Sequence, residues 1–335
     1  MRYPRLLSLV SGLLAALAIG AGPARAARVD EARPLMGTVV EIAAEADDET
    51  ALRAAVEAAY REMARLSDMM NHFDPKSVVS AINDAAGVRA VPAPPELMEV
   101  LAMARRLSAR SGGAFDVTIG SLRGWRFRPG EARLPSREEI AAQVAKVDYR
   151  RLRLDERAAT AFLAEPGMRI DLGGIAKLYI VHAGMRVLER AGVARAMVNG
   201  GGGDLEVIAP QGARPWRVGV RDPRAPDRLL GVVELTRGFV ASSGDYERYF
   251  IKEGKRYHHI LDPRTGFPSA GPRGVTLVGT VLETVNGVSI AIMVLGRDAG
   301  IRLIDATPGL DGLIVERDGR VWMSPGFRAR FRAAP

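Results

Sequence analysis

A histidine-containing segment could carry acid–base or phosphate chemistry. Residues 257–266 read Tyr-His-His-Ile-Leu-Asp-Pro-Arg-Thr-Gly and hold two of the four histidines, His258 and His259. A histidine there could bind phosphate, orient a hydroxyl nucleophile or act as a general base near neutral pH. Turn chemistry explains the Asp, Pro and Gly that follow, but it does not explain the two histidines. A catalytic and a structural interpretation both remain open for this segment.

The segment 171–177, Asp-Leu-Gly-Gly-Ile-Ala-Lys, joins an acid, two glycines and a lysine. It lies where a strand end is expected to pass into a helix that runs to Glu189. The N-terminus of a helix attracts anions, and Lys177 is expected one turn inside. The segment therefore predicts a phosphate site. The alternative is that Asp171 is an N-cap and Lys177 is solvated.

A run of four glycines, 200–203, lies between Asn199 and Asp204 and separates two apolar, strand-like stretches. Glycines allow positive φ and a close approach of the backbone to a ligand. The run lacks the spacing of a nucleotide-binding fingerprint, and no helix is expected after it. Taken alone, it favours a tight turn between strands.

Two further segments combine polar and aromatic residues: 113–118, Gly-Ala-Phe-Asp-Val-Thr, and 242–246, Ser-Ser-Gly-Asp-Tyr. Each is typical of a loop with a capped turn. Phe115 could stack on a planar ring, although most phenylalanines are core residues. The sequence contains no Ser-x-x-Lys pair, no Gly-x-Ser-x-Gly elbow and no His-Glu-x-x-His motif, which argues against serine hydrolases and zinc proteases.

The composition is that of a globular protein. Of the 335 residues, 47% are hydrophobic, 26% charged and 6% aromatic, which disfavours a disordered chain or a polytopic membrane protein. Cysteine is absent, so disulfides, thiolate metal sites and a cysteine nucleophile are excluded. The net charge of +8 is spread along the chain. Without a basic helix or interleaved aromatic and basic residues, no nucleic-acid partner is predicted.

Residues 1–26 have the pattern of a secretory signal peptide. Arg2 and Arg5 precede an apolar run over 6–21, and Ala-Arg-Ala at 24–26 is a small-x-small cleavage site. The apolar run is shorter than the ~20 residues that a spanning helix needs. We expect a Sec-type signal, a mature chain of 27–335, a periplasmic location and no stable membrane insertion after cleavage. A retained anchor is the alternative.

The remaining pattern predicts the elements that must position these segments. The fold class is α+β: a single compact body with mixed sheets and flanking helices. Apolar spacing and capping residues predict helices over 48–70, 77–83, 95–110, 137–145, 171–189 and 285–295. Short apolar runs predict strands at 37–46, 150–154, 161–163, 195–198, 205–208, 216–220, 229–235, 239–242 and 275–278.

Taken together and in order, seven segments resemble the ApbE family, the FAD:protein FMN transferases of bacterial envelopes. They are 35–38, 72–77, 113–118, 171–177, 198–204, 243–246 and 259–266. The resemblance implies a compact α+β body that holds FAD in a cleft and cuts its pyrophosphate with Mg²⁺. FMN would pass to a Thr or Ser of an envelope redox protein, the flavin acceptor, with release of AMP.

The resemblance also implies roles for individual residues. The flavin end of FAD would meet Met36, Ala114, Phe115 and Asp116. Other parts of the cofactor would meet Asp171, Lys177 and Ile260. The metal ligands would include the carbonyl of Gly174 and the side chain of Asn286. His259 would aid attack by the acceptor hydroxyl. A divalent ion and Lys177 would neutralise charge as AMP leaves.

The sequence departs from the family pattern at the metal segment. Asn286 and Ile290 stand where the family has Asp and Thr, and Leu178 and His182 replace a Gly and an Asp. An Asn can offer Mg²⁺ an oxygen without negative charge, whereas an Ile offers nothing. Three alternatives follow: a non-catalytic FAD-binding maturation accessory of a respiratory reductase, an FAD pyrophosphatase, or a secreted α+β protein whose loops only resemble the pattern.

Overall fold

The computed structural model describes residues 26–128, 130–201 and 203–334. Except for its last residue, the signal peptide expected over 1–26 lies outside the described residues. Within these ranges, no helix combines the length and the apolar character that crossing a membrane requires.

An eight-stranded sheet forms the centre of the fold. Its strand order is β1-β2-β6-β7-β10-β13-β14-β15. The bounds are β1 Ala27–Leu35, β2 Thr38–Ala46, β6 Arg195–Asn199, β7 Leu205–Ile208, β10 Arg237–Gly244, β13 Gly274–Gly279, β14 Asp311–Val315 and β15 Val321–Met323. Neighbouring strands of this sheet pair antiparallel, so the α+β class is confirmed, with antiparallel rather than mixed sheets.

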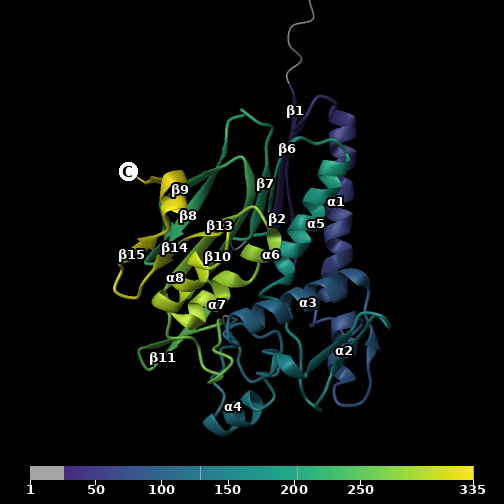
Figure 1. The fold of residues 1–335 in the computed structure, drawn as a ribbon, viewed down its shortest axis with the longest axis vertical. Helices are drawn as coiled ribbons and strands as arrows, with labels where there is room; N and C mark the ends of the chain where they lie inside the picture. Colours follow the sequence, from purple (N-terminus) through teal and green to yellow (C-terminus); the bar gives the residue numbers. More distant parts are fainter. Residues whose placement is uncertain (1–25, 129, 202, 335) are drawn as a thin grey trace, which may run out of the picture.

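Helices cover one face of this sheet. In Figure 1, α1 (Glu49–Met70) and α5 (Ala176–Arg190) run side by side next to β1, β2 and β6. The two helices approach closely because Gly184 of α5 lies against Met63 of α1, where a Cβ would come within 2.7 Å of the sulfur. The expected helix over 48–70 is confirmed, and the Asp48 side chain accepts its first amide hydrogen bonds, as an N-cap does.

Alternation along the strands separates two cores. Ile42 and Ala44 of β2 belong to the core under the helices, whereas Ala43 belongs to a second core on the opposite face. The second core is closed by a three-stranded sheet, β16-β9-β8, and by the fully buried Phe327 of α9. The bounds are β8 Trp216–Asp222, β9 Ala225–Leu235, α9 Pro325–Arg330 and β16 Phe331–Ala333.

A group of smaller elements lies beside the helical layer (Figure 1). It holds α2 Val78–Asp84, α3 Pro95–Arg110, α4 Arg137–Val144, the 3-10 helix η1 Tyr149–Arg151, and the sheet of β3 Val91–Pro92, β5 Thr160–Leu163 and β4 Leu152–Asp155. The hairpin of β11 (Tyr249–Lys252) and β12 (Lys255–His258) packs its aromatic side chains around Trp125. The helices expected at 77–83, 95–110 and 137–145 are confirmed within one residue at each end.

The prediction of one continuous apolar helix over 285–295 is wrong in one respect, because the helix is interrupted at Asn286 and Gly287. α6 (Leu282–Val285) stops before Asn286, and α7 (Val288–Leu295) starts after Gly287, whose φ of 75° belongs to the left-handed region. α8 (Arg297–Asp305) follows at once. The break matters because it turns the Asn286 side chain out of helical register and towards the loop before α5.

Candidate functional site

Segments far apart in the sequence meet at the N-terminus of α5. A Cβ added to Gly174 would lie 2.7 Å from Cδ1 of Ile290 and 3.2 Å from Cε2 of Phe115. The Asn286 amide nitrogen donates to the Ile175 carbonyl at 2.8 Å. The fold therefore gathers segments 113–118, 171–177 and 286–290 in one place, as the resemblance implies.

The loop before α5 is held by Asp171. Its Oδ1 accepts a hydrogen bond from Gly173 N at 2.7 Å and lies 3.5 Å from Nδ1 of His72. The helix itself begins at Ala176, and its N-cap is Ile175, which makes no side-chain cap bond. The interpretation of Asp171 as the N-cap is therefore wrong. Lys177 is the second helical residue rather than one turn inside, so its side chain starts from the N-terminal end of the helix.

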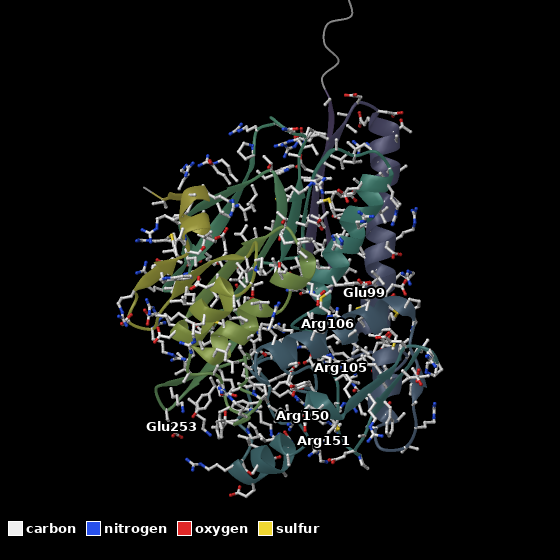
Figure 2. The ribbon with its side chains drawn as sticks, viewed as in Figure 1. Glu99, Arg105, Arg106, Arg150, Arg151 and Glu253 are labelled. Atoms are coloured by element: carbon white, nitrogen blue, oxygen red, sulfur yellow. The ribbon has the colours of Figure 1, made fainter. Side chains whose placement is uncertain are left out.

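Two contacts hold α5 in place. The hydroxyl of Tyr179 donates to Oε2 of Glu99 at 2.7 Å, which links α5 to α3. Glu99 is labelled on α3 in Figure 2. Burial and the neighbouring carboxylate raise the pKa of this phenol. Further along the helix, Nδ1 of His182 lies 2.9 Å from Oε2 of the buried Glu206 on β7. These contacts position the end of the helix that carries Lys177.

Gly200, Gly201 and Gly203 lie in the turn of the antiparallel β6–β7 hairpin, so the turn interpretation is confirmed for these three glycines. Gly203 has φ 98°, and a Cβ there would meet Cβ of Ser242 at 2.6 Å. Gly201 has φ 71° and packs against the side chain of Thr38. At both positions the close contacts leave no room for a side chain, so glycine is required. The contact of Gly201 with Thr38 brings the β1–β2 turn to the edge of the site.

Lys177 faces this turn. Its Nζ lies 3.4 Å from the carbonyl oxygen of Gly201 and 3.8 Å from Oδ2 of Asp204. Burial raises the pKa of Asp204 to about 6, and the nearby Lys177 opposes that shift. Lys177 keeps 24% of its side chain exposed, so it can meet an anion that enters from solvent.

His259 follows β12 directly and is half-buried. Its backbone N–H donates to the Arg248 carbonyl at 3.0 Å, whereas its side-chain Nδ1 is shielded from solvent and has no hydrogen-bond partner. Burial, helped by the positive charge of Arg248, lowers the pKa of His259 to about 3. The imidazole is therefore neutral at physiological pH, and in the free protein it is a weak base.

The neighbouring His258 is placed differently. It is 2% exposed, and its Nε2 lies 3.1 Å from the Ser269 carbonyl. Burial lowers its pKa as well. Ile260, expected to line the cofactor, is buried, and its carbonyl accepts a hydrogen bond from Ser269 N at 2.9 Å. This pairing with Ser269 holds the backbone on both sides of His259.

The 113–118 loop is a rigid wall of the site. Ala114 and Phe115 are buried, and Asp116 accepts hydrogen bonds from Thr118 N, Thr118 Oγ1 and Tyr149 N. Burial raises the pKa of Asp116, while these bonds lower it. Both oxygens of the Asp116 carboxylate thus accept hydrogen bonds from the protein. A contact of Asp116 with flavin remains a prediction.

Two further residues, Met36 and Phe73, lie around the site. Met36, expected near the flavin, lies in the β1–β2 turn with a positive φ of 54° and is half-buried against the main core. Phe73 was given no role from the sequence, yet 77% of it is exposed and its ring centre lies 3.9 Å from that of His72. Because His72 contacts Asp171, Phe73 offers a stacking surface beside the site. An aromatic residue in a polar loop after a long helix is the signal that could have identified it.

The predicted metal ligands do not fit a Mg²⁺ site. The Asn286 amide nitrogen is bonded to a carbonyl, and Ile290 packs an apolar carbon against Gly174. Across 26–128, 130–201 and 203–334, no three His, Cys, Asp or Glu side chains are grouped so that they could hold a metal ion. Mg²⁺ requires oxygen ligands and usually at least one carboxylate. Gly174 and Asn286 therefore lie together, but without the chemistry of a divalent-cation site.

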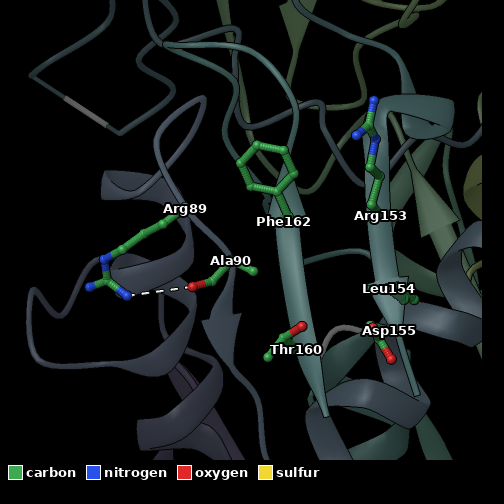
Figure 3. Close-up of a pocket in the computed structure, with 7 residues that line it drawn as sticks. All are labelled: Arg89, Ala90, Arg153, Leu154, Asp155, Thr160 and Phe162. Atoms are coloured by element: carbon green, nitrogen blue, oxygen red, sulfur yellow. Dashed lines mark hydrogen bonds between the residues drawn. The ribbon is translucent and has the colours of Figure 1, made fainter. Parts of the chain in front are cut away.

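A shallow pocket lies elsewhere, on the small β3-β5-β4 sheet (Figure 3). Phe162 stands between the side chains of Arg89 and Arg153, and Nη1 of Arg89 donates to the Ala90 carbonyl at 3.5 Å. The pocket is lined by Arg89, Ala90, Arg153, Leu154, Asp155, Thr160 and Phe162. It includes no residue of the segments described above, so it does not contribute to this site.

Comparisons with known proteins identify the family of this chain. A family model described as the ApbE family matches residues 36–314. An FAD:protein FMN transferase of Treponema pallidum is 29% identical over 329 residues, covering 93% of this chain and 91% of the relative. One from Klebsiella pneumoniae is 31% identical over 272 residues, covering 80% and 84%.

Solved structures give the same result. The crystal structure of an ApbE protein from Thermotoga maritima superposes with a TM-score of 0.83 at 33% identity, covering 91% of this chain and all of that one. The flavin transferase ApbE from Vibrio cholerae gives a TM-score of 0.78 at 27% identity, with the same coverage.

Proposed function

This chain belongs to the ApbE family, and from this premise we propose that it is an FAD:protein FMN transferase. It would move FMN from FAD to a Thr or Ser hydroxyl of an acceptor protein and release AMP. The observation that carries the proposal is the meeting of segments 113–118, 171–177 and 286–290 around the N-terminus of α5, where the positive charge of Lys177 also helps to lower the pKa of His259. Family relatives named as flavin transferases support the same activity.

The proposed step is a phosphoryl transfer with a simple atom balance. The acceptor oxygen attacks the phosphorus on the FMN side of the FAD diphosphate, and the anhydride P–O bond breaks. The bond electrons leave with AMP, and the hydroxyl proton passes to the neutral imidazole of His259. A nearby diphosphate would raise the pKa of His259 above its value in the free protein, which would make it a better base.

Lys177 contributes by charge. Negative charge grows on the bridging oxygen as AMP leaves, and an ammonium group nearby stabilises that charge most in a partly dry site. Asp204 restrains the lysine in the free protein at 3.8 Å. We infer that the diphosphate competes with Asp204 for this ammonium group.

Transfer can be tested directly. The protein is incubated with FAD and a flavin-acceptor domain, and the acceptor is analysed by in-gel fluorescence after denaturation and by mass spectrometry. We expect a covalent FMN adduct, together with AMP in the supernatant. Tight binding of FAD without any adduct would contradict the proposal.

A non-catalytic FAD-binding accessory is the second candidate, and the Asn286–Ile175 hydrogen bond favours it because the family's metal carboxylate is missing. An FAD pyrophosphatase would instead release free FMN and AMP. Chromatography of the same reaction separates the three outcomes: adduct, free FMN, or unchanged FAD.

We also propose export to the periplasm by the 1–26 signal, with a redox protein of the envelope as acceptor. The sequence pattern of residues 2–26 supports this part. N-terminal sequencing of the protein from a periplasmic fraction should begin at Ala27. A mature protein that still begins at Met1 in the cytoplasm would contradict it.

A further inference from the structure

We propose that this site holds the diphosphate of FAD without a resident divalent cation, and that Lys177 supplies the positive charge in its place. The proposal rests on the proposed function, because it takes FAD as the substrate. It concerns how this chain differs from relatives that carry a carboxylate in the same segment.

The first argument is the bond that Asn286 makes. This residue caps the C-terminus of α6, is 2% exposed, and donates its amide hydrogen to the Ile175 carbonyl at 2.8 Å. An aspartate here would set a carboxylate against that carbonyl, and two acceptors need a cation or a proton between them. The amide joins α6 directly to the loop before α5. The connection that a bridging cation would provide is therefore already made by the protein.

The second argument is the apolar cover over Gly174. Cδ1 of Ile290 and the ring of Phe115 approach its Cα so closely that a Cβ there would lie 2.7 and 3.2 Å from them. The neighbours of Gly287 are also mostly carbon, since a Cβ added to it would meet Cδ2 of Leu107 at 2.8 Å and Cε2 of Phe115 at 3.3 Å. Mg²⁺ keeps six oxygen neighbours, several of them water, and loses water reluctantly. Carbon atoms in this position leave too few oxygens for it.

The third argument is that the surrounding carboxylates are already engaged by donors of the protein. Asp171 accepts from Gly173 N, and Asp116 accepts from three donors. Asp245, which is 2% exposed, is paired with Arg256 at 3.1 Å. Asp204 is paired with Lys177. A metal that bound through any of these bonded oxygens would have to displace one of these partners.

What remains for an entering diphosphate is the ammonium group of Lys177. Its long contact with Asp204, 3.8 Å, is weaker than a direct hydrogen-bonded pair, and part of the side chain is exposed. A diphosphate carries more negative charge than one carboxylate, so Lys177 should bind the diphosphate in preference to Asp204.

The test measures FAD binding and cation binding separately on the full mature chain. FAD is titrated by flavin fluorescence and calorimetry in EDTA and again in excess Mg²⁺. We expect the dissociation constants to agree within about twofold, and Lys177→Met to weaken binding about tenfold in both buffers, equal to about 1.4 kcal/mol. Mn²⁺ is then titrated by electron paramagnetic resonance, with and without FAD, and no protein-bound signal is expected.

The matched variant is N286D combined with I290T, which restores the oxygen donors. It should gain a protein-bound Mn²⁺ signal, and its FAD affinity should become at least about tenfold stronger in Mg²⁺ than in EDTA. Gln211→Glu, an exposed residue between β7 and β8, adds the same charge elsewhere and should change neither result.

Two results would overturn the proposal: a wild-type FAD affinity that falls tenfold or more in EDTA, or stoichiometric binding of Mn²⁺ to the wild type. If the double variant does not fold, the titrations of the wild type with FAD and Mn²⁺ still test the proposal. A wild type that binds no FAD in either buffer contradicts the transferase function instead, and the Mn²⁺ titration then decides the cation question alone.

Discussion

Replacing Asp204 by Asn should stabilise the protein at neutral pH, although it removes an ion pair. Burial raises the pKa of Asp204 from 3.8 to about 6 even with Lys177 close by. A shift of about two pKa units corresponds to about 3 kcal/mol. Because 23% of the side chain is exposed, we reduce this to about 2 kcal/mol.

The sign follows from the direction of the shift. The folded chain holds the Asp204 proton more tightly than the unfolded chain, so protonation favours folding. This contribution is complete below pH 3.8 and is lost as the pH rises through about 6. The gain from Asp204→Asn should therefore be about 2 kcal/mol at pH 8 and close to zero near pH 4.

The measurement is urea unfolding followed by fluorescence of the three tryptophans, at pH values between 4 and 8. The control is Asp227→Asn, an exposed residue of β9, which should leave the pH profile unchanged. The variant should also bind FAD more tightly, because Lys177 loses its competing carboxylate. A variant that is less stable than the wild type at pH 8 would refute the reasoning, since it would mean that the ion pair outweighs the burial of the charge.

Three further changes test other parts of the site. His259→Asn should abolish transfer and leave FAD affinity within about twofold, as measured by adduct formation and by FAD titration; normal transfer would remove His259 from the mechanism. Phe73→Ala should weaken FAD binding about tenfold because a stacking surface is lost. Val88 is equally exposed but lies away from the site, so Val88→Ala should leave the FAD affinity unchanged; if the two variants weaken FAD binding equally, stacking on Phe73 is excluded. Tyr179→Phe should lower the free energy of unfolding by about 2 kcal/mol, because it removes a hydrogen bond to the charged Glu99; an unchanged urea midpoint would show that this link does not hold α5.

Local patterns predicted most of the secondary structure. The helix α1 is recognisable because Leu52, Val56 and Leu66 recur at helical spacing and Asp48 can cap it, and these are interactions between near neighbours. The strands β1, β3, β11, β12, β14, β15 and β16 were not predicted. Most of these strands are short or carry many polar residues, so pairing with another strand, as in the β1–β2 and β11–β12 hairpins, decides their conformation. β14 is different, because Leu313, Ile314 and Val315 form a buried apolar run that the prediction missed.

The break in the helix over 285–295 illustrates the limit of periodicity. The apolar residues continue across Asn286 and Gly287, so the pattern predicts one helix. Gly287 instead takes a left-handed conformation, and the side chain of Asn286 reaches the Ile175 carbonyl. A hydrogen bond between residues so far apart in the sequence outweighs the local preference for an uninterrupted helix.

The sequence by itself determined the family, most of the longer helices and the short segments that gather at the site, because each depends on residue types at fixed local spacing. Only the tertiary structure decided which atoms of those segments meet. It paired Lys177 with Asp204, left Nδ1 of His259 without a partner, and engaged Asn286 with a carbonyl instead of a cation. These outcomes depend on distances across the folded chain, which no local pattern encodes.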